Sequence, residues 1–292
     1  GLQSPVTSAD FVNTYTVTGS GDVTIGGKKI LNGRKLVAGE FTFGLYSDVL
    51  CQNAIETTTN NADGTFAFST LTYTASDLGE GNAEKIYTYY VKEVPGTKGG
   101  VTYNETVYTV TVKVSHENGV LTVTPSDNAA TLQITNTYKA EGVDVTLNGS
   151  KALSGDWSSV ANKDFSFQLF QADASFAITN TVPVKTATVN GKGSFNMKLR
   201  YEDGQEGSYY FVLKEDLSVK AGGVGYDAGE YHITVNVSDP GDGKLAATVT
   251  MYRPGTGNTT TAVFTNVYAV EPTTITLRGN KTLINTSTGL PK

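Results

Sequence analysis

The chain has 292 residues, which is enough for about two domains that each bury their own core. Its 22 basic and 28 acidic residues give a net charge of −6, which excludes the basic surface of a general nucleic-acid-binding protein. One cysteine excludes a disulfide framework or a cysteine-rich zinc site, and two histidines supply histidine-based metal or triad chemistry poorly.

The chain contains the same series of short segments twice. The opening segment Val23–Gly33 returns at Val145–Gly155, and part of it returns at Ile275–Leu283. The later segments recur in the same order: Phe41–Tyr46 as Phe165–Phe170, Gly64–Phe68 as Gly193–Met197, Tyr90–Glu93 as Val212–Glu215, and Ile134–Tyr138 as Phe264–Tyr268. Matching lysines and matching glutamates are both 122 residues apart, so the period is regular and indicates a tandem array.

This period predicts two whole repeats, with a fragment of another repeat at each end of the chain. The whole repeats are expected at residues 18–139 and 140–269. Residues 1–17 contain Phe11–Tyr15, a copy of the closing segment, and are interpreted as the last strand of a preceding repeat plus a linker. Residues 270–292 are interpreted as the first strand of a following repeat.

Nearly every segment alternates apolar and polar residues over four to eight positions and is bounded by a turn cluster such as Asn61–Gly64. No segment keeps an apolar helical period for three turns, although residues 75–85 have room for one helical turn. Short strands at regular spacing, without alternating helices, predict an all-β fold of tandem immunoglobulin-like β-sandwiches in an elongated rod. No apolar run approaches the ~18 residues of a membrane span, so none is expected in this fragment.

Each repeat places three polar residues on an otherwise apolar strand face. Residues of one parity share a face of a strand, and Lys29 has the parity of Val23 and Leu31. By the same rule, Glu93 in the middle segment and Asn136 in the closing segment point inward. The matching positions are Lys151, Glu215 and Asn266 in the second repeat, and the partnerless Asn13 and Lys281 in the end fragments.

Burying a charge costs several kcal/mol unless it is paired or neutralised, so the trio has two readings. In the first, lysine and glutamate form an ion pair capped by the asparagine amide, or reach solvent at the strand ends. In the second, desolvation lowers the pKa of the lysine and leaves a nucleophilic amine, while a protonated glutamate polarises the asparagine. Attack then expels ammonia and leaves a Lys–Asn amide. Recurrence of all three residues in the same order favours the second reading.

The opening Lys, Leu-x-Gly and Phe-x-Phe, the middle Tyr-Val-Lys-Glu and the closing Thr-Asn-Thr-Tyr resemble the pilin isopeptide-linkage domain of Gram-positive surface proteins. This family includes streptococcal T-antigen-type backbone pilins and is related in fold to collagen-adhesin B-type repeats. The resemblance implies self-formed bonds assisted by a glutamate: Lys29 to Asn136 with Glu93, and Lys151 to Asn266 with Glu215. The second repeat departs at Asp216 and Met197, neither of which belongs to the trio.

Two functions of different classes remain open. The first is a structural section of a stalk, pilus or filament on the bacterial cell surface, whose cross-links bear tension and whose partners are neighbouring repeats or other pilin subunits. The second is a ligand-binding adhesin region that uses a sandwich face or loops, with the extra eight residues of repeat two as the place to search. Neither is a turnover enzyme, because the implied reaction happens once per site. No cofactor is expected.

Other candidate sites receive structural interpretations. The adjacent Cys51 and Gln52 do not have a recognised thioester spacing and have no counterpart in the second repeat. Asn61–Gly64 lacks the later acidic ligand of a calcium loop, so a hairpin turn is expected. His116 and His232 lack partner patterns, and no metal site is predicted.

Overall fold

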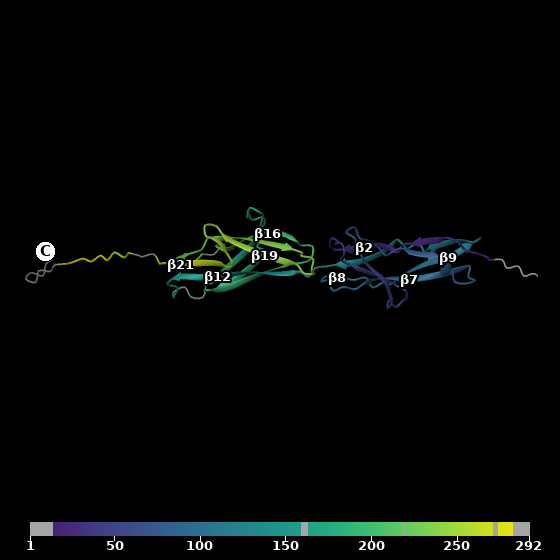
Figure 1. Cartoon of the computed structure of the whole chain (residues 1–292). Helices are drawn as coiled ribbons and strands as arrows, with labels where there is room; N and C mark the ends of the chain where they lie inside the picture. Colours follow the sequence, from purple (N-terminus) through teal and green to yellow (C-terminus); the bar gives the residue numbers. More distant parts are fainter. Residues whose placement is uncertain (1–13, 159–162, 219, 271–273, 283–292) are drawn as a thin grey trace, which may run out of the picture. The chain divides into compact units, whose positions relative to one another are not determined.

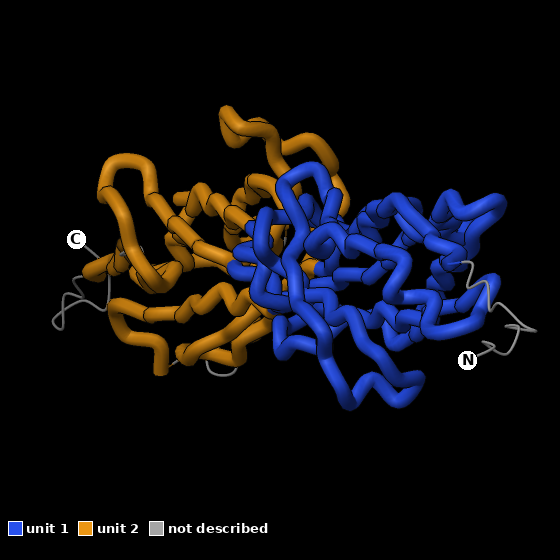
Figure 2. Tube along the Cα trace, turned by 45° about the vertical axis from the view of Figure 1, so that its right-hand side comes forward, with its two compact units in different colours: residues 1–143, 202–205, 238–246 blue, residues 144–201, 206–237, 247–292 orange. Residues whose placement is uncertain are grey.

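A computed structural model describes residues 14–158, 163–218, 220–270 and 274–282 (Figure 1). The chain divides into two compact units, and each contains one full set of the repeated strands (Figure 2). Unit 1 comprises residues 1–143, 202–205 and 238–246, and unit 2 comprises residues 144–201, 206–237 and 247–292. In the described part of the chain, all regular elements are strands except one short 3₁₀ helix, which confirms the all-β fold class.

Unit 1 is built from two main sheets and a small two-stranded one. The five-stranded sheet has the order β10 (Val120–Pro125), β9 (Tyr108–Glu117), β7 (Glu84–Val94), β3 (Thr42–Tyr46), β4 (Ala54–Thr59). The four-stranded sheet has the order β5 (Thr65–Ala67), β2 (Gly26–Asn32), β11 (Leu132–Tyr138), β8 (Val101–Thr102). The two-stranded sheet pairs β1 (Ser20–Val23) with β6 (Leu71–Thr74).

Unit 2 repeats the two main sheets, with one extra strand in the larger sheet, and its described residues form no separate two-stranded sheet. Its four-stranded sheet has the order β15 (Gly193–Tyr201), β12 (Val143–Gly155), β21 (Ala262–Tyr268), β17 (Val224–Gly225). Its six-stranded sheet has the order β14 (Lys185–Asn190), β13 (Asp164–Ala172), β16 (Gly207–Glu215), β18 (Glu230–Ser238), β19 (Ala246–Arg253), β20 (Gly257–Thr259). The β19–β20 hairpin lies within the longer stretch between Glu215 and Asn266 that distinguishes this repeat.

The apolar faces of the two main sheets meet in the core of each unit. Burial alternates strictly along β11, where every second residue from Leu132 to Tyr138 is buried. In unit 1 the ring of Phe43 stacks on that of Phe66 from the facing sheet, with centroids 4.0 Å apart. In unit 2 the Phe167 and Phe195 rings stack in the same way at 4.2 Å. The period-two pattern of the sequence therefore produces a sandwich core in each unit.

The first and last strands of each repeat are parallel neighbours. Strand β2 pairs with β11 so that Lys29 is opposite Ile134 and Leu31 is opposite Asn136. Strands β12 and β21 have the same register, with Leu153 opposite Asn266. Because residues two apart share a strand face, each lysine and its asparagine are diagonal neighbours on the core side of one sheet.

The opening segment of repeat 1 differs from the single strand that its alternation predicts. It forms β1 and β2 with residues 24–25 between them, whereas unit 2 has the continuous β12. The break arises because β1 pairs with β6, while β2 pairs with β5 and β11, so the chain changes partners at this point. The expected helical turn is present as the 3₁₀ helix η1 (Ala75–Leu78).

The two end fragments have different outcomes. Asn13 lies outside the described residues. Residues 274–282, predicted to begin another repeat, form no strand, and Ile275 and Leu277 are 82% and 87% exposed. A strand needs a neighbour to take up its backbone hydrogen bonds, and no described strand lies beside these residues. Within the described residues, no helix has the length and apolar character needed to cross a membrane.

Candidate functional site

Each unit encloses one of the predicted polar trios in its core. In unit 1, Lys29 lies on β2, Asn136 on the neighbouring β11, and Glu93 on β7 of the facing sheet. Each of the three is 1% exposed. The strand pattern alone explains why they point inward, because each occupies the apolar parity of its strand.

Glu93 bridges the other two members of the first trio through its two carboxylate oxygens. Lys29 Nζ donates to Glu93 Oε2 at 2.7 Å. Asn136 Nδ2 donates to Glu93 Oε1 at 2.7 Å. One carboxyl group therefore contacts both the amine that would attack and the amide nitrogen that would leave.

The trio of unit 2 has the same geometry. Lys151 Nζ donates to Glu215 Oε2 at 2.7 Å, and Asn266 Nδ2 donates to Glu215 Oε1 at 2.8 Å. All three residues are buried, with exposures of 3% or less. Two stretches of different sequence thus build one arrangement, which favours a shared chemical purpose over two unrelated buried ion pairs.

Burial lowers the pKa of both lysines of the trios. Desolvation lowers the pKa of Lys29 from its ordinary value, and the hydrogen bond and charge of Glu93 oppose this shift without cancelling it. Burial lowers the pKa of Lys151 in the same way, against the opposing effect of Glu215. Each lysine is therefore neutral in a larger share of molecules than an ordinary lysine at the same pH, and a neutral amine is the nucleophilic form.

Aromatic rings enclose the two amines. Lys29 Nζ lies 4.5 Å from the centroid of the Phe41 ring, and Lys151 Nζ lies 4.6 Å from that of Phe165. Phe43 and Phe167 follow at 6.0 Å each. These residues are the repeated Phe-x-Phe motif, so the motif forms the apolar wall that excludes water from each lysine.

A backbone amide is directed at each asparagine carbonyl. The N–H of Asn104 donates to Asn136 Oδ1 at 2.8 Å, and the N–H of Asp227 donates to Asn266 Oδ1 at 2.8 Å. Such a donor polarises the carbonyl and stabilises the negative charge that develops on its oxygen during attack. Strand alternation along the sequence does not point to these two donors. The sequence does contain a signal for them, because Asn104 follows Tyr103 and Asp227 follows Tyr226, and these two tyrosines occupy matching positions of the two repeats.

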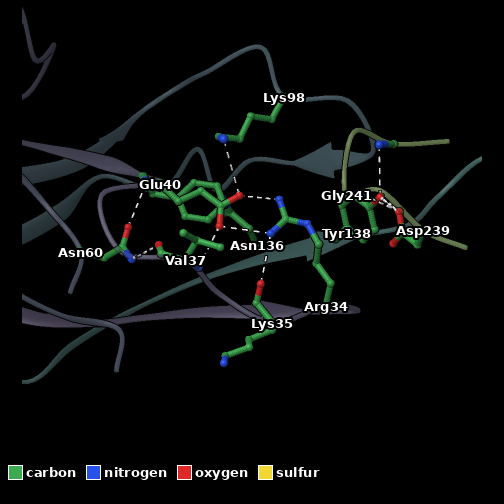
Figure 3. A network of polar contacts seen from close by, with 12 residues as sticks. Arg34, Lys35, Val37, Glu40, Asn60, Lys98, Asn136, Tyr138, Asp239 and Gly241 are labelled. Atoms are coloured by element: carbon green, nitrogen blue, oxygen red, sulfur yellow. Dashed lines mark hydrogen bonds and ion pairs between the residues drawn. The ribbon is translucent and has the colours of Figure 1, made fainter. Parts of the chain in front are cut away.

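A second carboxylate acts on Lys29 from the loop before β3. The charge of Glu40 raises the pKa of Lys29, against the larger effect of burial. Arg34 holds this carboxylate through both of its terminal nitrogens, and the Val37 N–H donates to Glu40 Oε2 at 3.1 Å (Figure 3). Asp164 occupies the matching position of repeat 2, where it is exposed, so the second unit lacks this pair.

The remaining candidate residues are not part of either site. Lys281 is exposed in the stretch that forms no strand. Cys51 is a half-buried free thiol in a turn, with a positive φ of 53°. The described ranges contain no cluster of three or more histidine, cysteine or acidic side chains that is suited to a metal ion. A turn is present at residues 61–64, closed by the Gly64 N–H donating to the Asn61 carbonyl at 3.0 Å, but it is not the predicted hairpin, because β4 and β5 on either side of it belong to different sheets.

Comparison with known proteins gives the trios a family context. Residues 25–139 and residues 147–269 each match FctA, described as the Spy0128-like isopeptide containing domain. Together the two matches cover well over half of the chain. The chain belongs to this family. Its two FctA domains correspond to the two repeats, and each contains one complete buried trio.

Several solved structures are similar to this chain at low sequence identity. The major pilin of Streptococcus pyogenes is 18% identical, with 85% of this chain and 98% of that chain covered and a TM-score of 0.26. A single B repeat unit of the collagen binding surface protein of Staphylococcus aureus is 14% identical, with 87% and 100% covered and a TM-score of 0.21. A C-terminal fragment of the pilus adhesin SpaC from Lactobacillus rhamnosus GG is 16% identical, with 85% and 100% covered and a TM-score of 0.25. No curated protein matches the chain.

Proposed function

We propose that this chain is a tension-bearing section of a bacterial surface stalk or pilus, closed by two self-formed isopeptide bonds. The bonds join Lys29 to Asn136 and Lys151 to Asn266. The observation that carries the proposal is the bridging carboxyl group, which contacts the amine with one oxygen and the amide nitrogen with the other in both FctA domains.

The contacts support a balanced reaction in the first domain. Glu93 takes a proton from the Lys29 ammonium, and the neutral Nζ attacks Cγ of Asn136. A carbon–nitrogen bond forms, and the carbonyl electrons move to Oδ1. The carbonyl re-forms as the Cγ–Nδ2 bond breaks, and Nδ2 leaves as ammonia with the proton that Glu93 delivers through Oε1. The second Nζ proton then passes through Glu93 to this ammonia, which departs as ammonium and leaves a neutral amide. The carboxyl group ends the reaction unchanged, so each site acts once and the chain is not a turnover enzyme.

The position of each bond explains how it would carry load. The lysine lies on the first strand of its repeat, the asparagine lies on the last, and the two strands are adjacent. Force entering along β2 would pass through the amide into β11, so the residues between Lys29 and Asn136 would bear none of it. Extracellular location and assembly with neighbouring repeats or other pilin subunits follow from this role. No cofactor takes part in the reaction.

Intact mass under denaturing conditions tests the chemistry. Each bond removes one ammonia, so the purified chain should be lighter than its sequence mass by about 17 Da per bond. Peptide mapping should then recover Lys29 joined to Asn136 and Lys151 joined to Asn266. A full sequence mass would contradict the proposal and leave the trios as buried ion pairs.

Single-molecule pulling tests the mechanical role. The wild-type chain should show no unfolding step for either domain. A Lys29→Met chain should release the 106 residues between the former bond partners, which span roughly 370 Å when extended. Lys28→Met is the matched control, because Lys28 is exposed on the same strand and should leave the trace unchanged. An unfolding step of that length in the wild type would contradict the role.

A further inference from the structure

The loops that present the backbone donors are anchored to the strand that carries the reacting asparagine. In unit 1 the Asn104 side chain accepts from the Thr106 N–H at 3.0 Å and donates to the Thr135 carbonyl at 3.4 Å. Thr135 directly precedes Asn136. The side chain of residue 104 therefore holds its own peptide group against the residue that would react.

Unit 2 achieves the same anchoring with a charged residue. Asp227 Oδ2 accepts from the Thr265 N–H at 3.0 Å, and Thr265 directly precedes Asn266. Asp227 Oδ1 accepts from the Gly229 N–H at 2.9 Å, which folds the loop. The aspartate side chain is 10% exposed and therefore requires a counter-charge.

Arg253 supplies that counter-charge from the end of β19, where this strand turns into β20, the strand that has no counterpart in unit 1. Its Nη2 donates to Asp227 Oδ1 at 2.6 Å. Its Nη1 donates to Tyr231 Oη at 3.0 Å and to the Val263 carbonyl at 2.8 Å. The guanidinium thus links the loop to β18 and to β21, the strand of Asn266, and it cannot shift without moving the loop.

We propose that Asp227 and Arg253 are positioning residues for bond formation in the second domain, and that the Asp227 N–H is the catalytic donor to Asn266 Oδ1. Asn104 has the corresponding role in the first domain without an arginine. This inference rests on the proposed isopeptide chemistry. As Lys151 Nζ attacks, negative charge moves to Oδ1 and the held N–H stabilises it, while Glu215 carries the proton from Nζ to the departing Nδ2.

Asp227 and Arg253 also influence the pKa of Lys151. Two carboxylates act on Lys151: Glu215 of β16, and Asp227 of the loop before β18, each of which raises the lysine pKa against the larger effect of burial. The β13 side chains facing the amine are the rings of Phe165 and Phe167. Arg253 neutralises Asp227, so loss of the guanidinium should raise the pKa of Lys151 and leave less neutral amine at a given pH.

The test follows bond formation over time in the full chain. The protein is made in a cell-free pulse, quenched in denaturant at intervals, and digested to quantify both cross-linked peptides. Repeat 1 serves as an internal control in every sample. Asp227→Ala should slow the repeat 2 bond at least about tenfold and leave the repeat 1 bond unaffected, because the donor loses its anchor. The rate of repeat 2 bond formation in Asp227→Asn should lie between the rates of Asp227→Ala and the wild type.

The pH dependence separates positioning from a merely structural role. Arg253→Met should slow the repeat 2 bond and displace its pH–rate profile to higher pH. Adding Asp227→Asn to Arg253→Met should return the profile to its wild-type position, because the uncompensated carboxylate is gone. Arg278→Met is the control, since Arg278 is exposed outside the domain. Circular dichroism confirms that each variant is folded.

Three results would overturn the inference. The first is a wild-type rate in Asp227→Ala, and the second is a slower Arg253→Met whose pH profile does not move. Either leaves the isopeptide chemistry intact, because the repeat 1 bond still forms in the same molecules. The third is a wild-type chain that retains its full mass in both repeats, which would overturn the proposed function as well.

Discussion

Replacement of Lys29 by methionine tests how much the first cross-link contributes to stability. Methionine keeps an unbranched side chain in the space that Lys29 occupies, and it removes the nucleophile. The bond would close a loop of 107 residues, and the chain-entropy relation for cross-links gives a loss of about 5 kcal/mol when it is absent. For a domain of this size, that loss corresponds to a fall in melting temperature of roughly 20 °C.

The second domain supplies an independent check on this magnitude. Lys151 and Asn266 are 115 positions apart in the chain, and the stabilisation by a cross-link depends on the logarithm of the loop length. Lys151→Met should therefore cost nearly the same free energy of unfolding in its own domain. Each variant should be about 17 Da heavier than expected for a chain with both bonds, because one ammonia is no longer lost. Calorimetry on the same sample should show that the melting transition of only one domain has moved.

Controls separate the cross-link from other effects of the substitution. Lys28→Met removes the same charge from an exposed position of β2 and should leave both transitions in place. Lys29→Met leaves Glu93 buried without its partner, which adds destabilisation of its own. The double variant Lys29→Met/Glu93→Gln carries no buried charge, so its shift reports mainly the cross-link. The chain-entropy reasoning is refuted if this double variant has the same melting temperature as Lys28→Met although the mass of the wild type shows that two ammonias have been lost.

Three further outcomes are expected. Glu93→Gln should halve the total mass deficit, because glutamine cannot carry the proton from amine to amide; a full deficit by mass spectrometry would remove Glu93 from the reaction. In Asn136→Ala, which keeps Lys29 as a free buried amine, urea denaturation should show stability rising with pH toward the ordinary lysine pKa of 10.5, because the folded chain has the lower lysine pKa and the unfolded chain binds more protons in that window. Adding Lys29→Met should remove this slope, and a slope of opposite sign would contradict the assignment. Gly27→Ala should destabilise repeat 1, because its Cβ would lie 2.1 Å from a backbone oxygen of β11, whereas Gly279→Ala has open space and should be neutral in thermal melts.

Much of the candidate site was predictable from the sequence because strand geometry is local. In a strand, alternate side chains face opposite sides, so parity alone placed Lys29, Glu93 and Asn136 on the apolar faces. The second copy of each segment gave the same result without further information. The interruption between β1 and β2 was not predictable in this way, since it depends on which strands lie beside the segment.

The repeat, the all-β class and the residues that point inward all follow from patterns along the chain. Packing between distant segments makes β2 and β11 adjacent and parallel, with a register that makes Lys29 and Asn136 diagonal neighbours. The same packing places the backbone N–H groups of Asn104 and Asp227 where they donate to the asparagine carbonyls. The physical reason is range: side-chain alternation follows from each residue's own backbone, whereas strand partners, register and loop donors follow from packing between segments far apart in the chain.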